Sequence, residues 1–335
     1  MAPKKGILLI NLGTPDSLEI ADLRRYLREF LSDRRVLTVP APLRWLLLNL
    51  IILPFRPRKI RENYSKIWTP EGSPLDVYAK KLSKGISDIL GGEYQVAYAM
   101  RYGNPRISDK LSAMTAQGIT DVLVVPLFPQ YAMATTGSLY ARVFELLQGK
   151  YHIPSVSFLG DYYDKDFFTG AQAEIARPYL EKPYDKVVFT YHATHAVITA
   201  TANRTAAGKI TEQNAFCYQA QCHATSRSLA AKLSIPEDKY IVSFQSRFGP
   251  AEWIQPYTTD VLKKLGKNGG RVVVMCPAFT ADCVETLEEI NEEERETFMH
   301  AGGKEYDTVP CVNDHPLWIN GLAREVQRFF SARPN

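Results

Sequence analysis

One histidine and a row of carboxylates have the residue types that metal binding and proton transfer require. His192 follows the apolar run Val187–Thr190. Side chains at the carboxyl ends of parallel strands face the crevice in which such folds bind ligands. The carboxylates recur at i, i+3, i+7 and i+10, which places them on one stripe of a helix: Asp282, Glu285, Glu289 and Glu292. Imidazole and carboxylate groups ligate divalent transition metals and accept protons. By position alone, a core histidine and a solvated acidic helix face remain alternatives.

Two arginines also follow strand-like runs. Arg101, with Tyr102 beside it, ends one apolar run, and Arg247 follows another. A guanidinium group can pair with a ligand carboxylate through two hydrogen bonds. We favour ligand binding for Arg101 because it stands at a strand end, and an interdomain salt bridge is the alternative.

The elements that would position these residues follow an alternating pattern. Helix-like stretches such as Ile20–Leu31, Ala220–Lys232 and Pro316–Phe330 separate short apolar runs that are rich in β-branched residues. The strand-like runs are Ile7–Asn11, Val96–Met100, Val122–Val125, Val187–Thr190, Ile241–Phe244 and Val272–Met275. Buried strands alternating with helices predict an α/β fold with parallel sheets covered by helices.

The two halves of the chain resemble each other. Arg101-Tyr102-Gly103 in the first half is echoed by Arg247-Phe248-Gly249 in the second, and Pro126-Leu127-Phe128 is echoed by Pro277-Ala278-Phe279. The two repeats occur in the same order and at nearly the same spacing. We therefore expect two similar Rossmann-like domains, at residues 1–160 and 161–335, with a ligand cleft between them.

Composition narrows the class of protein. The 335 residues carry 40 Lys and Arg against 36 Asp and Glu, a net charge of +4, and no basic run interleaved with aromatic residues. This pattern does not favour nucleic-acid binding. Five cysteines in a chain of this size argue for a reducing compartment rather than a disulfide scaffold. The first residues run directly into a strand-like segment, so we expect no signal peptide and a cytoplasmic location.

One apolar segment raises the question of a membrane. The run Trp45–Phe55 is almost wholly apolar, and four basic residues follow it: Arg56, Arg58, Lys59 and Arg61. It is shorter than the roughly 20 residues of a membrane-spanning helix. A buried helix is one interpretation, and an apolar lip with a basic rim that rests weakly on a membrane surface is the other.

Ordered motifs along essentially the whole chain resemble those of the ferrochelatases, which insert Fe²⁺ into a porphyrin. In the first half they are Asn11–Pro15, Gly72–Leu75, Arg101–Pro105, Pro126–Tyr131 and Thr135–Ser138. In the second half they are Ser243–Gly249, Trp253, Gln255–Thr258, Cys276–Phe279 and Asp282–Ile290. The resemblance implies a chelatase-like pair of domains, an enzyme of heme synthesis, and porphyrin and Fe²⁺ as ligands.

The resemblance also implies roles for particular residues. It assigns His192 and Glu285, on opposite sides of the porphyrin, to catalysis and metal binding, without saying which of them holds the metal and which takes protons. We expect the porphyrin to contact a wider set of residues: Leu12, Ser73, Arg101, Tyr102, Tyr131, Thr136, Arg247 and Trp253. Coproporphyrin-type members resemble one another in having Tyr where this chain has Leu12, so Leu12 favours protoporphyrin IX.

Two further expectations concern departures from the family. Family members usually continue the histidine strand with His-Gly-Leu-Pro or His-Gly-Ile-Pro, whereas this chain reads His192-Ala193-Thr194-His195. A non-catalytic porphyrin- or heme-binding homologue, a coproporphyrin enzyme and a chelatase for another divalent metal therefore stay open as alternatives. An iron–sulfur cluster needs four ligands, and neither the C-terminal tail nor the loop after His192 offers them, so we expect no such cofactor. The sequence does not give the oligomeric state.

Overall fold

The computed structural model describes residues 4–194, 210, 214–247 and 252–332, and the chain divides into two compact units. Unit 1 comprises residues 1–128, 132–160 and 319–335, and unit 2 comprises residues 129–131 and 161–318. The units differ from the two expected spans chiefly in the C-terminal helix. Most of that helix belongs to unit 1, because the ring of Phe330 packs at a tilt against that of Tyr94 and Ile319 packs where Gly85 has no side chain.

Each unit is built on a four-stranded parallel sheet. The strands of unit 1 lie in the order β2-β1-β3-β4 and those of unit 2 in the order β6-β5-β7-β8. The strands are β1 (Lys4–Gly13), β2 (Tyr94–Tyr102), β3 (Ile119–Pro126), β4 (Ser155–Phe158), β5 (Lys186–His192), β6 (Tyr240–Gln245), β7 (Arg271–Met275) and β8 (Glu305–Thr308). The order is identical in the two units, which confirms the α/β class and the internal repeat. All six predicted strands are present, and the edge strands β4 and β8 were not predicted.

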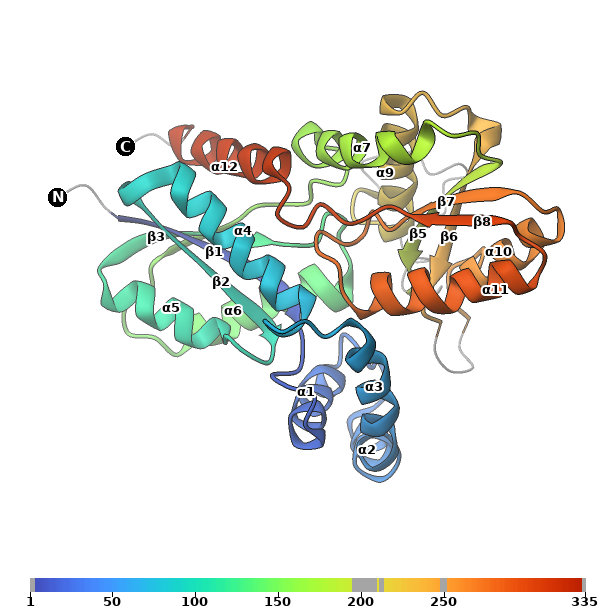
Figure 1. Cartoon of the computed structure of the whole chain (residues 1–335). Coiled ribbons are helices and arrows are strands. Elements are labelled where there is room, and N and C mark those ends of the chain that lie inside the picture. The colour runs from blue at the N-terminus through green and yellow to red at the C-terminus, as the bar shows by residue number, and fades with distance from the viewer. Residues whose placement is uncertain (1–3, 195–209, 211–213, 248–251, 333–335) are drawn as a thin grey trace. The chain divides into compact units, whose positions relative to one another are not determined.

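Helices cover both faces of each sheet (Figure 1). In unit 1 they are α4 (Pro74–Leu90), α5 (Ile107–Ala116), α6 (Ser138–Gln148) and most of α12 (Pro316–Ser331), with the short η2 (Gly91–Glu93) and η3 (Met133–Gly137). In unit 2 they are α7 (Asp166–Leu180), α9 (Tyr218–Lys232), α10 (Thr258–Lys267), η6 (Glu285–Glu294) and α11 (Arg295–His300), with the short η5 (Glu237–Lys239).

The cores explain why the central strands read as continuous apolar runs. Leu8 and Ile10 of β1 lie in a buried cluster with side chains of α5 and α6, while Ile7 and Leu9, which point to the other face, are equally buried. In unit 2, Val272 and Val274 of β7 pack against Ile290 of η6. Burial on both faces is typical of the middle strands of a parallel sheet.

Besides its sheet and the helices that cover it, unit 1 has a group of helices at one end of the sheet, at the bottom of Figure 1. It consists of α1 (Ile20–Ser32), α2 (Ala41–Leu46), η1 (Leu47–Ile52) and α3 (Leu53–Ile67). We call α2, η1 and α3 together the apolar hairpin (Ala41–Ile67). None of the helices in the described part of the chain has both the length and the apolar character to cross a bilayer.

Candidate functional site

His192 is the last residue of β5 and is half-buried. Its ring Nδ1 lies 2.8 Å from the carbonyl oxygen of Ala193. A carbonyl oxygen only accepts, so Nδ1 is the nitrogen that carries the hydrogen. The lone pair of Nε2 is then available for a metal ion or a proton, which is how a backbone contact selects the tautomer of a metal-binding histidine.

Gln245 links the histidine strand to the acidic helix. It ends β6 and pairs in register with His192 of β5. Its buried side chain accepts a hydrogen bond from Thr190 Oγ1 (3.0 Å) and donates from Nε2 to the backbone oxygen of Glu285 (3.4 Å). Glu285 is the first residue of η6. The same edge of the sheet in unit 2 therefore carries both His192 and the start of the acidic helix.

The acidic helix is a π-helix, and this corrects the expected α-helical stripe. Hydrogen bonds from i to i+5 widen each turn, so residues four and five positions apart stack along the helix. The row is then Glu285, Glu289 and Glu294 rather than one that includes Asp282 and Glu292. Asp282 precedes the helix, where its carboxylate accepts hydrogen bonds from Thr286 Oγ1 and from Asn313 Nδ2.

Glu289 is a carboxylate of η6 whose pKa is strongly shifted. Burial raises its pKa to about 7, opposed by a hydrogen bond from Ser246 Oγ (2.5 Å) and reinforced by the negative charges of Glu285 and Glu294. Ser246 itself has a φ of 63°, a conformation that is uncommon for a residue with a side chain. A group with this pKa exchanges protons near neutral pH, which suits an acceptor of pyrrole protons. The sequence showed Glu289 in the acidic row but gave no sign of Ser246.

Other groups in this part of unit 2 are held protonated or shielded. Burial raises the pKa of Cys276 and of Cys283 well above the usual range, and for Cys283 the neighbouring charge and hydrogen bond of Glu285 add to the effect. All five cysteines are buried and free. Among the described residues, no group of three or more His, Cys, Asp and Glu side chains is arranged to hold a metal ion.

The remaining expected contacts in unit 2 differ in exposure. Tyr131 is half-buried, and its ring meets that of Phe216 edge-on at 5.4 Å. The exposed Arg247 lies with its guanidinium carbon 4.8 Å from the ring centroid of Tyr257. Trp253 is buried at 9% exposure. His195 and most of the altered stretch that follows His192 lie outside the described residues.

The expected contacts in unit 1 gather near the carboxyl ends of β1, β2 and β3. Leu12 is half-buried against the apolar hairpin, and Ser73 is buried with its hydroxyl accepting from Thr14 Oγ1 at 2.8 Å. Thr136 of η3 is 3% exposed, and its Oγ1 has no hydrogen-bond partner in the described structure. An unsatisfied buried hydroxyl of this kind is available to a ligand.

Arg101 and Tyr102 are engaged inside unit 1. The Arg101 guanidinium forms an ion pair with Asp33 (2.6 Å), and Nε donates to Ser138 Oγ (2.8 Å). The Tyr102 hydroxyl donates to the same Asp33 carboxylate at 3.0 Å. Asp33 lies in none of the sequence motifs, and Ser138 ends one of them but was not expected as a site residue, because nothing in the local pattern relates either residue to Arg101.

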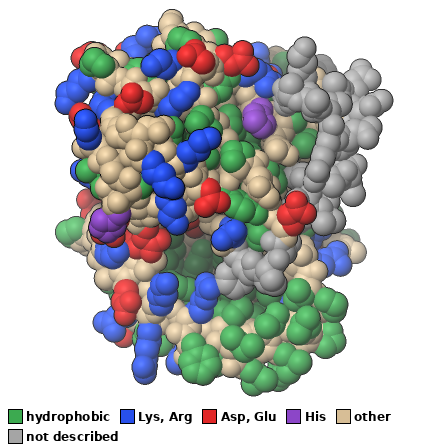
Figure 2. Space-filling view, turned by 90° about the vertical axis from the view of Figure 1, so that its right-hand side faces the viewer, with side chains coloured by type: hydrophobic (Ala, Val, Ile, Leu, Met, Phe, Trp, Pro, Cys, Tyr) green, Lys and Arg blue, Asp and Glu red, His purple; other side chains and the backbone are tan. Residues whose placement is uncertain are grey.

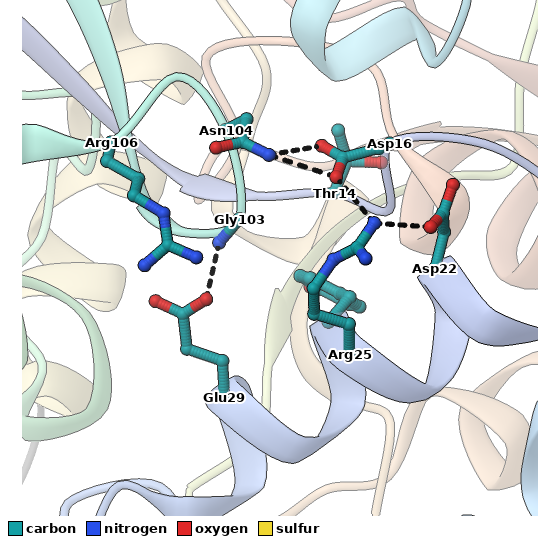
Figure 3. Close-up of a pocket in the computed structure, with 9 residues that line it drawn as sticks. Thr14, Asp16, Asp22, Arg25, Glu29, Gly103, Asn104 and Arg106 are labelled. Carbon is teal, nitrogen blue, oxygen red and sulfur yellow. Dashed lines mark hydrogen bonds and ion pairs between the residues drawn. The ribbon is translucent and has the colours of Figure 1, made fainter. Parts of the chain in front are cut away.

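A small polar hollow lies beside this group (Figure 3). Asp16 binds both the Asn104 amide (2.9 and 3.0 Å) and the Arg25 guanidinium (3.1 Å), and Glu29 accepts from the backbone nitrogen of Gly103 (3.1 Å). These charges bind one another and join the loops after β1 and β2. A hollow lined in this way does not suit an apolar macrocycle.

The fold, with its two α/β units, resembles that of chelatases of known structure. It superposes on SirB from Bacillus subtilis with Fe³⁺ with a TM-score of 0.55 at 13% identity, covering 97% of this chain and 95% of that one. A cobalt complex of the sirohydrochlorin chelatase SirB from Bacillus subtilis subspecies spizizenii gives 0.53 at 13% identity, with 97% and 94% covered. At this level of identity the likeness concerns the fold alone.

The sequence comparisons are more specific. The ferrochelatase family model matches residues 4–329. A ferrochelatase of Herminiimonas arsenicoxydans is 42% identical over 96% of this chain and 86% of its own length. One from Legionella pneumophila strain Lens is 38% identical over 98% and 100%, and one from Chromobacterium violaceum is 41% identical over 96% and 87%. The chain belongs to the ferrochelatase family, as its motifs indicate.

Proposed function

We propose that this protein inserts Fe²⁺ into protoporphyrin IX with release of two protons, the terminal step of heme synthesis. Membership of the ferrochelatase family makes it an enzyme that loads iron into a porphyrin. The observation that carries the assignment of the site is the link from His192 through Gln245 to the start of η6. It brings an imidazole and a row of carboxylates to one edge of one sheet.

The proposed chemistry divides between two kinds of group. Nε2 of His192 and the carboxylate of Glu285 meet the incoming metal or take a pyrrole proton first. Glu289 then receives protons, because burial holds its pKa at about 7 while the Ser246 hydroxyl stabilises its ionised form. This relay needs no permanently bound metal, in keeping with a cation that is a substrate and leaves with the product. We propose that no iron–sulfur cluster takes part, since a cluster needs four ligands and neither the C-terminal tail nor the loop after His192 offers four cysteines.

The porphyrin contacts are proposed from the expected residues. The half-buried Leu12 offers an apolar surface that suits the vinyl-bearing protoporphyrin, and Thr136 offers a buried hydroxyl that has no partner in the described structure. Ser73, Tyr131, Arg247 and Trp253 complete the set. Arg101 and Tyr102 were also expected in this set, but their polar groups are already bound to Asp33 and Ser138.

We also propose that the protein rests on a membrane surface through the apolar hairpin. Six large apolar side chains of this segment are 45–72% exposed, and they form the patch at the lower end of the face shown in Figure 2: Leu43, Trp45, Leu46, Leu50, Ile51 and Phe55. Exposed Arg56, Arg58 and Lys59 follow the patch in sequence. An apolar surface with a basic rim fits an interfacial contact with anionic lipid. A poorly soluble porphyrin gives such a contact a purpose.

Substitution of His192 tests the proposal. Losing a group that transfers protons costs about 10²–10⁴-fold in rate, so His192→Ala should lose that much insertion of Fe²⁺ or Zn²⁺ into protoporphyrin while porphyrin binding survives. Glu285→Gln should give a similar or smaller loss. The exposed His152, changed to Ala, is the matched control. Near-normal insertion by His192→Ala would remove the site assignment, and an unmutated protein that binds porphyrin but inserts no metal would favour a binding homologue.

A further inference from the structure

Asp33 stands where α1 ends and the chain turns towards the apolar hairpin. Its side chain is only 7% exposed. One carboxylate oxygen, Oδ2, receives three hydrogen bonds, two from the end of β2 and one from the start of α6: from Arg101 Nη2 at 2.6 Å, Tyr102 Oη at 3.0 Å and Ser138 Oγ at 2.5 Å. A buried carboxylate is stable only when it is compensated in this way.

The other polar atoms of Asp33 bind the chain that leads into the hairpin. Oδ1 accepts from the backbone nitrogen of Arg35 at 2.7 Å. The backbone oxygen accepts from Val36 at 3.1 Å and from Leu37 at 3.0 Å. Asp33 therefore fastens the segment that leads into the apolar hairpin to the end of β2 and to the start of α6.

The Arg101 side chain is held in place by further contacts. Its Nε donates to both the backbone oxygen (3.2 Å) and the hydroxyl (2.8 Å) of Ser138, and its guanidinium carbon lies 4.4 Å from the centroid of the Tyr102 ring. Burial by itself raises the pKa of Asp33, but the bonds from Ser138, the Arg35 nitrogen and Tyr102, together with the charge of Arg101, leave it lowered. The pair is therefore ionised and closed over the whole neutral range of pH.

The apolar side of the same junction reaches a proposed porphyrin contact. Leu48 and Leu53 of the hairpin form a buried cluster with Tyr26, Leu27 and Tyr102. Leu12 packs against this cluster. The position of the hairpin thus determines the surface that Leu12 presents, and the Asp33–Arg101 pair fixes where the hairpin begins.

We propose that Asp33 and Arg101 are positioning residues, which hold the apolar hairpin against Leu12 and thereby set porphyrin affinity, and that Arg101 does not itself bind a porphyrin carboxylate. The inference rests on the proposed function, because it takes Leu12 to line the porphyrin site. It also gives Asp33, which none of the motifs contains, a defined task.

The test is a double-mutant cycle measured with two porphyrins. Asp33→Asn, Arg101→Gln and the double variant are assayed for Zn²⁺ insertion into a porphyrin with free propionates and into its dimethyl ester in the same detergent. Each single change should raise KM about tenfold with a smaller change in kcat, and the double variant should be no worse than the poorer single one, because both changes break the same contact. The increase should be equal for the acid and the ester. Arg142→Gln, which breaks the exposed pair with Glu145, is the control.

Three results would overturn the proposal. An increase in KM for Arg101→Gln that appears with the free acid and not with the ester would make Arg101 a direct carboxylate ligand. Additive effects of the two substitutions would mean that the residues act separately. Limited trypsin cleavage supplies a readout that does not depend on activity, since loosening the apolar hairpin should speed cleavage after the exposed Arg58 and Lys59 in both single variants. Unchanged cleavage would also contradict the positioning role of Asp33 and Arg101. If the unmutated protein inserted no metal, only the proposed function would be contradicted.

Discussion

Glu289 makes folding stability depend on pH in a direction opposite to that of an ordinary surface carboxylate. Its pKa rises from 4.5 to about 7 in the folded protein because the group is buried beside Glu285 and Glu294. The folded state therefore binds more protons than the unfolded chain between these values, and stability falls as pH increases through this window. Below pH 4.5 the ionisation of Glu289 costs no stability, and well above pH 7 the full cost is present.

The magnitude follows from the size of the shift. One pKa unit corresponds to 1.36 kcal/mol, so the difference between 4.5 and about 7 gives an upper limit of about 3 kcal/mol at pH 8. Water reaches this half-buried side chain, so we expect about 1–3 kcal/mol. Glu289→Gln removes the charge and keeps an oxygen that can accept from Ser246. The variant should match the parent near pH 4.5 and exceed it by that amount at pH 8.

The assay is urea unfolding at closely spaced pH values from 4.5 to 8.5, followed by tryptophan fluorescence. Glu296→Gln on α11 changes an exposed carboxylate of the same region and serves as the control, which should show no such pH-dependent gain. If the stability difference between Glu289→Gln and the parent is the same at pH 5 and pH 8, the pKa of Glu289 is not raised in the folded protein. Glu289 would then not be suited to accept protons near neutral pH.

Three further outcomes are expected. Leu50→Glu with Phe55→Glu should abolish co-sedimentation with anionic vesicles and leave insertion into detergent-solubilised porphyrin intact, whereas Leu50→Met with Phe55→Leu should bind as the parent does. The purified protein should contain no acid-labile sulfide and should show no visible absorption from an iron–sulfur centre. The double variant Cys217→Ser with Cys222→Ser should keep its activity within about twofold of the parent, since the buried thiols take no part in the proposed mechanism. Leu12→Tyr should raise the ratio of kcat/KM for coproporphyrin to kcat/KM for protoporphyrin by roughly tenfold, which is within the range that a single pocket contact supplies. An unaltered ratio would show that Leu12 does not select the substrate.

The sequence predicted those features that are local or that depend on burial. Buried strands such as Val122–Val125 and Val272–Met275 are recognisable because both faces are covered and every position is apolar. The edge strands β4 and β8 escaped prediction because they are four residues long and partly solvated, with the sequences Ser-Val-Ser-Phe and Glu-Tyr-Asp-Thr. The repeat of the sheet order was visible as two pairs of matching strand ends.

The site was predicted less completely, and the reason is physical. His192 and Glu285 follow recognisable strands, so their place at a sheet edge can be inferred from the chain. Whether η6 winds as an α- or a π-helix cannot be inferred from the sequence, because both windings bury Ile290. Only the winding decides that Glu294 rather than Glu292 continues the row. The burial of Asp33 and its pairing with Arg101 could not be predicted at all. Arg101 is 68 residues away in the sequence, and nothing in a stretch ending Leu-Ser-Asp indicates a buried carboxylate. The role of an arginine at a strand end therefore depends on whether the fold brings it a counter-ion, and here it does.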